Sequence, residues 1–344
     1  MPVRGAISIA TKCDLSGVGM QVAFAGSFAM RLVDAVRARL SLPCDVIVDD
    51  EAAIVPRLAD VDVLVSMGFS ARMAAAAPRL RLVQVPGAGL DRIDRGAIRP
   101  GTQLANAYGH EVGIAEYIMG AMIALTRSFA RLDAGLRQGH WESQFAVGTA
   151  APPLWPELAG KTLGILGFGH IGQALARRAS AFDMRVCAVR RQMQADFPRG
   201  VAFIGGLERL DDVLRDADYL AITLPLSQET HNLIDDRRLR LLRPTAFLIN
   251  VARAEICDEA ALYHALASRR LAGAALDVWY NYPTAAEPTS PATQDFRALD
   301  NVLMTPHVSG WTQGMLDARA SLIAENIVRT AKGEPPRNAI DPAL

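Results

Sequence analysis

The chain has 344 residues, of which 51% are hydrophobic, so it can bury a large core, and its length suggests two domains. Its 36 basic and 36 acidic residues cancel, which argues against nucleic acid or an acidic membrane as a partner recognised by bulk electrostatics. The four cysteines are widely separated and form no C-x-x-C pair, so the pattern indicates neither a disulfide scaffold nor a metal site.

The first part of the chain alternates short apolar runs with amphipathic stretches. Strands are predicted at residues 20–24, 44–48, 61–66 and 82–85, and helices at residues 28–40, 51–59 and 71–77. The N-terminus lacks a charged start followed by an apolar block, and no apolar run is long enough to span a membrane. We therefore expect a soluble, cytoplasmic protein.

A second series of elements begins after Gly160. Strands are predicted at residues 162–166, 185–189, 219–223, 246–250, 272–277 and 302–304, and they are largely apolar on both faces, as a parallel sheet covered by helices requires. Long helices predicted at residues 112–132 and 312–332 bracket this series, and the second ends at Gly333 with two prolines beyond. The pattern predicts two α/β units, with the chain leaving the first and later returning to it.

The segment KTLGILGFGHIG, residues 161–172, has a glycine pattern typical of dinucleotide binding. An apolar strand runs into Gly167, Gly169 and Gly172 in G-x-G-x-x-G spacing, and a helix predicted at residues 171–182 follows directly. Gly167 would allow the tight turn, Gly169 the approach of a pyrophosphate, and Gly172 close packing of helix on strand. The phosphates would lie at the helix N-terminus. A glycine-rich turn without a ligand is the alternative.

Four segments together carry a family resemblance: GFGHIG at 167–172, NVARAEICDEAAL at 250–262, AALDVW at 274–279 and NVLMTPHVSG at 301–310. In order and spacing they resemble the D-isomer-specific 2-hydroxyacid dehydrogenases, which reduce 2-keto acids of the glyoxylate or hydroxypyruvate type by hydride transfer. The resemblance implies two doubly wound parallel-sheet domains, Rossmann-like and flavodoxin-like, with a cleft between them. Residues 1–108 plus 309–344 would bind substrate, residues 109–308 would bind the dinucleotide, and the protein would commonly be a homodimer.

Arg253 and His307 are the candidate catalytic residues. Arg253 lies just beyond the strand that ends at Asn250, where open α/β sheets bind ligands, and a guanidinium can hold a carboxylate with two hydrogen bonds. His307 follows the last strand, and an imidazole exchanges protons near neutrality. A surface arginine and a structural histidine are the alternatives. The family usually has glycine where Ala254 stands, which questions the conformation of that turn.

A third position departs from the family. Five residues after Asp277, where the family usually has a glutamate that pairs with the histidine, this chain has Tyr282. Either Tyr282 orients His307 by a hydrogen bond alone, or Glu287 supplies the carboxylate from a lengthened loop. We favour Tyr282, because its spacing from the strand is fixed. In that case His307 should titrate close to its free value, and reduction should decline above about pH 6.5.

The end of the strand at 185–189 indicates whether the cofactor carries a 2′-phosphate. NAD-dependent enzymes place an acidic residue there, whereas this strand ends in Arg190 and Arg191, with no acid before Asp196. Two guanidiniums would bind a 2′-phosphate, so NADP(H) is the predicted cofactor, with NAD(H) possible; the alternative is that both arginines are merely solvated. The resemblance implies that the full set of cofactor-binding residues is Gly167, Phe168, Gly169, His170, Ile171, Gly172, Arg190, Arg191, Leu224, Pro225, Val251, Ala252 and Asp277.

Two loops of the first domain are predicted to meet the substrate carboxylate through backbone N–H groups. They are SMGFS at 66–70 and PGAGLD at 86–91, and the side chains of Met67 and Phe69 could cap an apolar substrate. Ordinary turns are the alternative for both loops, and structural roles are the alternatives for His110 and Trp311. The candidate substrate-binding residues are Met67, Gly68, Phe69, Gly87, Ala88, Gly89, His110 and Trp311.

Three further hypotheses concern the arm, a regulatory function and another reaction. Residues 139–156 are predicted to form an extended arm, which is either a surface loop or a dimer contact through Trp141, Phe145 and Trp155. Some relatives of these dehydrogenases are dinucleotide-sensing transcriptional corepressors, and retention of Arg253 and His307 does not exclude that function. Formate or phosphite oxidation is the other enzymatic candidate, although residue 282 is not the glutamine typical of formate dehydrogenases.

Overall fold

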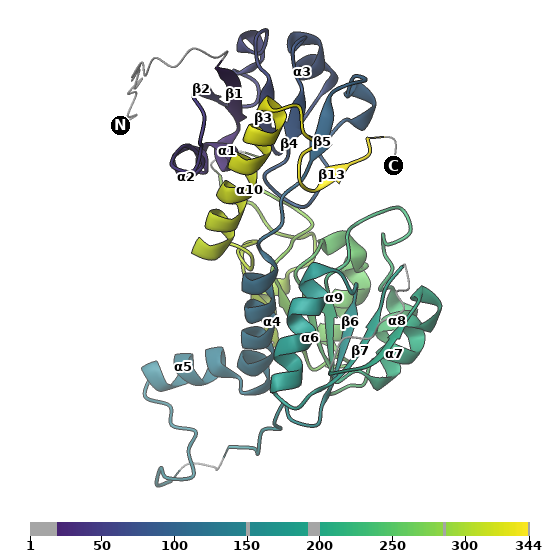
Figure 1. Ribbon diagram of the computed structural model, residues 1–344. Helices are drawn as coiled ribbons and strands as arrows, with labels where there is room; N and C mark the ends of the chain where they lie inside the picture. Colours follow the sequence, from purple (N-terminus) through teal and green to yellow (C-terminus); the bar gives the residue numbers. More distant parts are fainter. Residues whose placement is uncertain (1–18, 149–151, 192–199, 285–286, 343–344) are drawn as a thin grey trace. The chain divides into compact units, whose positions relative to one another are not determined.

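The structure is a computed structural model that describes residues 19–148, 152–191, 200–284 and 287–342. It divides into two compact α/β units, which are drawn in Figure 1. Unit 1 consists of the described residues up to Gly109 and those from Gln313 onward, and unit 2 runs from His110 to Thr312. The chain crosses between units after residues 109 and 312, against crossings predicted after residues 108 and 308.

Unit 1 is built on a sheet in the order β2-β1-β3-β4-β5-β13. Its first five strands are parallel, and only β13 runs antiparallel, beside β5. The strands are β1 (Met20–Ala25), β2 (Cys44–Asp49), β3 (Val63–Ser66), β4 (Leu82–Gln84), β5 (Gln103–Ala105) and β13 (Ala339–Ile340). The helices are α1 (Ser27–Met30), α2 (Val33–Arg37), α3 (Ala71–Ala76) and α10 (Gln313–Ala331), with short 3-10 helices η1 (Val55–Arg57) and η2 (Arg95–Ala97).

The return of the chain to unit 1 is fixed by helix α10. Its buried face, which includes Ile323 and Ile327, packs into the same core cluster as β1 and α2. Gly333 ends the helix with a φ of 73°, and the next residue, Glu334, donates its backbone N–H to the Arg329 carbonyl at 2.9 Å. A left-handed glycine after a helix satisfies the last carbonyls, which is why the sequence signal at this position is reliable.

Unit 2 is built on a seven-stranded parallel sheet in the order β8-β7-β6-β9-β10-β11-β12. Its strands are β6 (Thr162–Leu166), β7 (Arg185–Val189), β8 (Val201–Gly205), β9 (Tyr219–Ile222), β10 (Phe247–Asn250), β11 (Gly273–Leu276) and β12 (Val302–Met304). Its helices are α4 (Glu111–Thr126), α5 (Phe129–Arg137), α6 (His170–Ala181), α7 (Leu210–Asp216), α8 (Asp236–Leu239) and α9 (Glu259–Ala267), with 3-10 helices η3 (Leu207–Arg209), η4 (Ala254–Ile256) and η5 (Phe296–Ala298). The order reverses direction beside β6, which puts the glycine motif at the switch point where such sheets bind ligands.

The fold class is confirmed, because both sheets are parallel apart from β13 and both are covered by helices. The helix predicted at 51–59 is wrong: only η1 forms there, since Pro56 lacks the N–H that a continuing helix needs. The helix predicted at 28–40 is two short helices, and the one predicted at 112–132 is α4 and α5, separated by the left-handed Ser128 (φ 51°). Strands β5, β8 and β13 were not predicted.

Among the described residues, no single helix is long and apolar enough to cross a membrane. Helices α4 and α5 satisfy that test only as a pair, by length and composition, and they are bent by 59° at their junction. Ile114, Ile118 and Met122 of α4 are buried in the core of unit 2. The apolar character of α4 therefore reflects its packing against the sheet.

Candidate active site

The three glycines of the dinucleotide motif are each required for a different reason. Gly167 has a φ of 105°, and a Cβ added there would lie 2.6 Å from the backbone nitrogen of Leu224. A Cβ on Gly172 would lie 2.5 Å from the Gly167 carbonyl oxygen, so helix α6 approaches the turn as closely as backbone allows. A Cβ on Gly169 would meet nothing within 4 Å. The turn is therefore tight at its two ends and open in the middle, which is the shape that a pyrophosphate needs.

The other predicted cofactor residues differ in what they expose. Phe168 is 2% exposed and belongs to the core of unit 2, so only its backbone is available to a ligand. The side chains of Leu224, Val251 and Ala252 are also buried. By contrast His170, at the start of α6, and Pro225 are exposed. The glycine turn and the neighbouring strand ends would therefore hold a dinucleotide mostly through backbone groups at the carboxyl ends of β6, β9 and β10.

Arg190 and Arg191 stand at the carboxyl end of β7. The Arg190 backbone N–H donates to the Gly205 carbonyl at the end of β8 at 2.9 Å, and the Arg191 side chain is exposed. Asp196, the next acid along the chain, lies outside the described residues. The end of β7 therefore presents cationic side chains where an acidic residue would select NAD.

Tyr282 and His307 are in direct contact. The Tyr282 hydroxyl lies 2.8 Å from Nδ1 of His307, and the Trp279 backbone N–H donates to the same hydroxyl at 3.4 Å. A phenol can donate to Nδ1 of a neutral imidazole or accept from the protonated Nδ1–H of an imidazolium. In either state Nε2 is left for a substrate. Among the described residues no hydrogen bond or ion pair joins Glu287 to His307, and Glu287 is exposed.

The turn that carries His307 is held by a buried carboxylate. Asp277, which follows β11, has no exposed surface. One of its oxygens accepts from the Thr305 hydroxyl at 2.6 Å and the Val308 backbone N–H at 2.9 Å, and the other accepts from the Ser309 N–H at 2.8 Å. His307 has a left-handed φ of 56°, a costly conformation for a residue with a side chain. Asp277 fixes both sides of this residue.

A second tether reaches the same turn from helix α4. The Thr305 hydroxyl has one proton, which it donates to Asp277, so it accepts from the Tyr117 hydroxyl at 2.6 Å. Burial of the Tyr117 phenol is the main reason that its pKa is raised. The indole N–H of Trp279 also donates to the Thr305 carbonyl at 2.8 Å. Tyr117 and Thr305 were not predicted as site residues, because nothing in the sequence pattern pairs a helix residue with a loop residue that far away.

Arg253 lies in the turn after β10. The Asn250 side chain accepts from the Ala252 backbone N–H at 3.0 Å and donates to the Arg253 carbonyl at 2.9 Å, which shapes the turn. Ala254 is not among the residues with positive φ, so the missing glycine imposes no strain. Desolvation raises the pKa of Tyr282 and lowers that of His307, and the charge of Arg253 opposes the first shift and adds to the second. The three predicted catalytic side chains of unit 2 therefore share one electrostatic environment.

The pKa of His307 is lowered from the usual imidazole value, chiefly because the surrounding protein desolvates the ring. The nearby Asp277 carboxylate opposes this shift, and the Arg253 guanidinium adds to it. Desolvation also raises the pKa of the Tyr282 phenol, so the partner of His307 is a neutral group. The expectation that His307 titrates near its free value is therefore wrong: sequence patterns do not report desolvation.

In unit 1 the two predicted substrate loops lie against each other. A Cβ added to Gly87 would be 3.2 Å from the thioether of Met67. The Phe69 ring is 3% exposed and belongs to the core of unit 1, so the idea that it caps a substrate is wrong for the ring. Only the backbone of Phe69 is available, and its N–H already donates to the Arg92 carbonyl at 3.0 Å. Ala88 and Gly89 are partly exposed.

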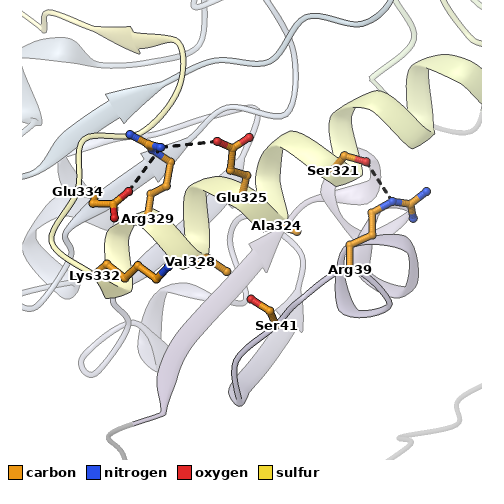
Figure 2. Close-up of a pocket in the computed structure, with 9 residues that line it drawn as sticks. All are labelled: Arg39, Ser41, Ser321, Ala324, Glu325, Val328, Arg329, Lys332 and Glu334. Atoms are coloured by element: carbon orange, nitrogen blue, oxygen red, sulfur yellow. Dashed lines mark hydrogen bonds and ion pairs between the residues drawn. The ribbon is translucent and has the colours of Figure 1, made fainter.

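A separate hollow of about 460 Å³ lies along α10 in unit 1 (Figure 2). Its charged side chains pair with one another, since Arg329 contacts both Glu325 and Glu334. Arg39 is likewise bound to Ser321 and Asp317. The hollow is lined by none of the residues predicted to act in catalysis.

Known proteins resemble this chain over most of its length. The family model for the NAD binding domain of the D-isomer specific 2-hydroxyacid dehydrogenases matches residues 119–309. The glyoxylate reductase of Pyrococcus furiosus is 35% identical over 298 residues, 84% of each chain, and that of Thermofilum pendens is 33% identical over 312 residues, 85% of this chain and 87% of the relative.

Solved structures show the same fold. The NADPH-dependent glyoxylate/hydroxypyruvate reductase of Sinorhizobium meliloti, in complex with citrate, superposes with a TM-score of 0.76 at 26% identity over 94% of this chain and 97% of that one. A D-isomer specific 2-hydroxyacid dehydrogenase of Xanthobacter autotrophicus, in complex with NADPH and MES, gives 0.75 at 27% identity over 94% and 98%. The chain therefore belongs to the D-isomer-specific 2-hydroxyacid dehydrogenases and is an NAD(P)-dependent oxidoreductase of that family.

Proposed function

We propose that the protein reduces a 2-keto acid of the glyoxylate or hydroxypyruvate type with NADPH, using Arg253, His307 and Tyr282. The observation that carries the catalytic part is the 2.8 Å contact between Tyr282 and His307, within the field of the Arg253 guanidinium. When bound, the reduced nicotinamide supplies the hydride. Glyoxylate reductases at 35% identity and a structural relative that reduces glyoxylate and hydroxypyruvate support this substrate class.

Each residue has one task in this proposal. Arg253 binds the substrate carboxylate and polarises the neighbouring carbonyl, because a guanidinium offers several N–H donors and a permanent charge. Nε2 of His307 donates a proton to the oxygen of C2 as negative charge develops there. Tyr282 keeps the ring oriented by its bond to Nδ1. Asp277, as a fixed carboxylate, favours the protonated ring that reduction requires.

The experiment is a steady-state assay with glyoxylate, hydroxypyruvate and pyruvate, following oxidation of NADPH. Turnover above about 1 s⁻¹ is typical of a metabolic enzyme. Arg253→Ala should lower kcat/KM by more than roughly tenfold, since a charge-assisted bond is lost in the transition state. Absence of turnover with every keto acid, together with unchanged dinucleotide binding, would instead favour a corepressor-like role.

The preference for NADPH rests on Arg190 and Arg191. A charge-assisted hydrogen bond to a 2′-phosphate contributes roughly 1.5 to 3 kcal/mol, so Arg191→Ala should lower kcat/KM for NADPH by roughly tenfold or more and leave NADH unchanged. Arg185→Ala is a matched control, because Arg185 is an exposed arginine at the opposite end of the same strand. A wild-type kcat/KM for NADPH no better than that for NADH would reject the preference.

We also propose a cytoplasmic homodimer whose contact includes the arm after α5. Phe145 is 88% exposed and Trp141 is 58% exposed, an unusual amount of aromatic surface for one short segment. In Figure 1 this segment extends away from the sheet of unit 2. Phe145→Asp should therefore convert a dimer to a monomer in size-exclusion chromatography with light scattering. A wild-type protein that elutes as a monomer would refute the dimer.

A further inference from the structure

The loop at residues 86–91 in unit 1 bonds its carbonyl groups to the protein and leaves N–H groups unbonded. The Gly87 carbonyl accepts from the Ala107 backbone N–H at 3.0 Å, and the Ala88 carbonyl accepts from the Asn106 side chain at 3.0 Å. The backbone N–H groups of Ala88 and Gly89 make no hydrogen bond to any described residue, and both residues are partly exposed. Successive unbonded N–H groups in a turn are typical of anion binding.

The geometry of the peptide unit links these two observations. Within one planar trans unit, the C=O and N–H bonds point in opposite directions. The Ala88 carbonyl and the Gly89 N–H belong to one unit, and the Gly87 carbonyl and the Ala88 N–H belong to the unit before it. Because both carbonyls point to partners in unit 1, both N–H groups point away from those partners.

Asn106 supplies one of the two bonds that set this orientation. Its side chain, directly after β5, is 3% exposed, and Nδ2 is the atom that donates to Ala88. The other polar atom, Oδ1, is buried and has no hydrogen-bond partner among the described residues. A buried acceptor without a partner is unfavourable, so this half of the amide brings no stability. What the side chain supplies is the donor that holds the Ala88 carbonyl inward.

The base of the loop is fixed separately, by two fully buried amide side chains. Nε2 of Gln84, the last residue of β4, donates to the Val85 carbonyl at 3.0 Å. Oε1 of Gln84 accepts from the Asn326 side chain of α10 at 2.7 Å. The strand end before the loop is therefore held from α10, whereas the orientation of the peptide units further along depends on Ala107 and Asn106.

We propose that Asn106 is a positioning residue, whose bond to the Ala88 carbonyl keeps the N–H groups of Ala88 and Gly89 turned toward the carboxylate of the keto acid. This inference rests on the proposed function and deepens it. An ionised carboxylate has about four lone-pair sites, so a guanidinium that uses two of them leaves others for N–H donors. The carboxylate keeps its charge throughout the reaction. Its binding is therefore uniform, which lowers KM without raising kcat.

The test is the steady-state kinetics of Asn106→Ala with glyoxylate and hydroxypyruvate at saturating NADPH. We expect KM for the keto acid to rise by roughly tenfold or more, because charge-assisted hydrogen bonds are lost, and kcat to stay within about threefold of the wild type. The Kd for NADPH, measured by fluorescence titration, should be unchanged, because the candidate dinucleotide residues all lie in unit 2.

Asn106→Leu separates loss of the donor from loss of volume. Leucine has a similar branched shape without a donor, and nothing is lost at Oδ1, which has no partner among the described residues. We expect KM to be as high as in Asn106→Ala. A wild-type KM in Asn106→Leu would show that the space was filled to no other purpose, and would overturn the role of the donor.

Thr102→Val is the matched control for a loss of stability. Thr102 directly precedes β5, at the opposite end from Asn106, and its hydroxyl donates to the Leu80 carbonyl at 2.8 Å. Each variant thus loses one side-chain bond to a backbone carbonyl in unit 1. Thr102→Val should lower the Tm about as much as the Asn106 variants and leave KM unchanged. An equal rise of KM in Thr102→Val would overturn the positioning role.

The remaining outcomes separate this inference from the function on which it rests. A wild-type KM in both Asn106 variants, or a loss confined to kcat, overturns the positioning role and leaves the reductase intact. Failure of the wild-type protein to reduce any keto acid overturns the proposed function, and the inference with it.

Discussion

Replacement of Tyr282 by glutamate tests the electrostatics of the His307 site. The present partner of His307 is a neutral phenol 2.8 Å from Nδ1, and the pKa of the imidazole is lowered by desolvation. Reduction needs the imidazolium, whose population is full below that pKa and is lost as the pH rises through it. As the pH rises, we therefore expect the wild-type rate of reduction to begin to decline already below about pH 6.5. A carboxylate at residue 282 should move that decline to higher pH.

The size of the shift follows from the geometry. Because glutamate is shorter than tyrosine, its charge would lie about 4 Å from the imidazolium, where two unit charges attract by about 4 kcal/mol at an effective dielectric constant near 20. Tyr282 is 49% exposed, so solvent screening reduces this attraction. If about half remains, 2 kcal/mol corresponds to roughly 1.5 pKa units.

The assay is the pH dependence of kcat/KM for the keto acid at saturating NADPH, which reports the pKa of the enzyme before the keto acid binds. Tyr282→Gln is the matched control, because glutamine has the shape of glutamate without its charge. We expect the alkaline limb to move upward by roughly 1.5 units in Tyr282→Glu and not in Tyr282→Gln. Equal profiles for the two variants would show that the charge at residue 282 does not reach His307, and the reasoning would be refuted.

Three other predictions follow from the local geometry. Gly169→Ala should fold with an unchanged Tm, because its methyl meets nothing within 4 Å, yet bind NADPH at least roughly tenfold more weakly by fluorescence titration, whereas Gly167→Ala should lower the Tm. Asp277→Asn should destabilise the protein by about 3 kcal/mol in urea unfolding, since an amide cannot accept all three hydrogen bonds that the buried carboxylate accepts. Because the Asp277 charge raises the pKa of His307, the same variant should also lower the pH above which reduction declines. Tyr117→Phe should cost about 1 kcal/mol of stability and hardly change the pH above which reduction declines, because Tyr117 contacts Thr305 and not His307. A large shift of that pH would contradict this arrangement of hydrogen bonds.

The inner strands of the second series could be predicted because they are buried on both faces, whereas the edge strand β12 is only half-buried. Residues 162–166, 185–189 and 302–304 form strands with the predicted limits. A strand covered by helices on both sides must be apolar at every position, which leaves a continuous signal in the sequence. Strands β5 and β13 are only three and two residues long, so the same signal is too short to register. Their existence depends on pairing with neighbours, a tertiary effect.

Helix prediction failed where a local break outweighed the periodic pattern. The apolar spacing continues through residues 127 and 128, yet Ser128 adopts a left-handed conformation and α5 turns away from α4 by 59°. None of the residues in α5 is buried. A period in the sequence shows that a segment can be amphipathic, but it does not show what lies against its apolar face. The side chains of Phe69 and Phe168 illustrate the same limit, because both loop phenylalanines turn inward.

The sequence pattern identifies the candidate catalytic residues, but it does not show how the charges around them are balanced. Arg253, His307 and Tyr282 were named from spacing, and the contact between the last two exists. What spacing could not supply is the role of Asp277, whose carboxylate is engaged by three donors around the turn. A buried carboxylate with that many donors is a consequence of how β11 and β12 end side by side, and no linear motif encodes it.

The strained turn at His307 explains why this arrangement tolerates a neutral partner. A left-handed backbone at a residue with a side chain costs of order 1 kcal/mol and persists only where neighbouring groups fix it. Asp277 and Thr305 do so from within unit 2, independently of residue 282. The position of the imidazole is therefore set by its backbone, while the hydroxyl of Tyr282 orients the ring. A change between carboxylate and phenol at that position is therefore expected to leave the turn that carries His307 in place.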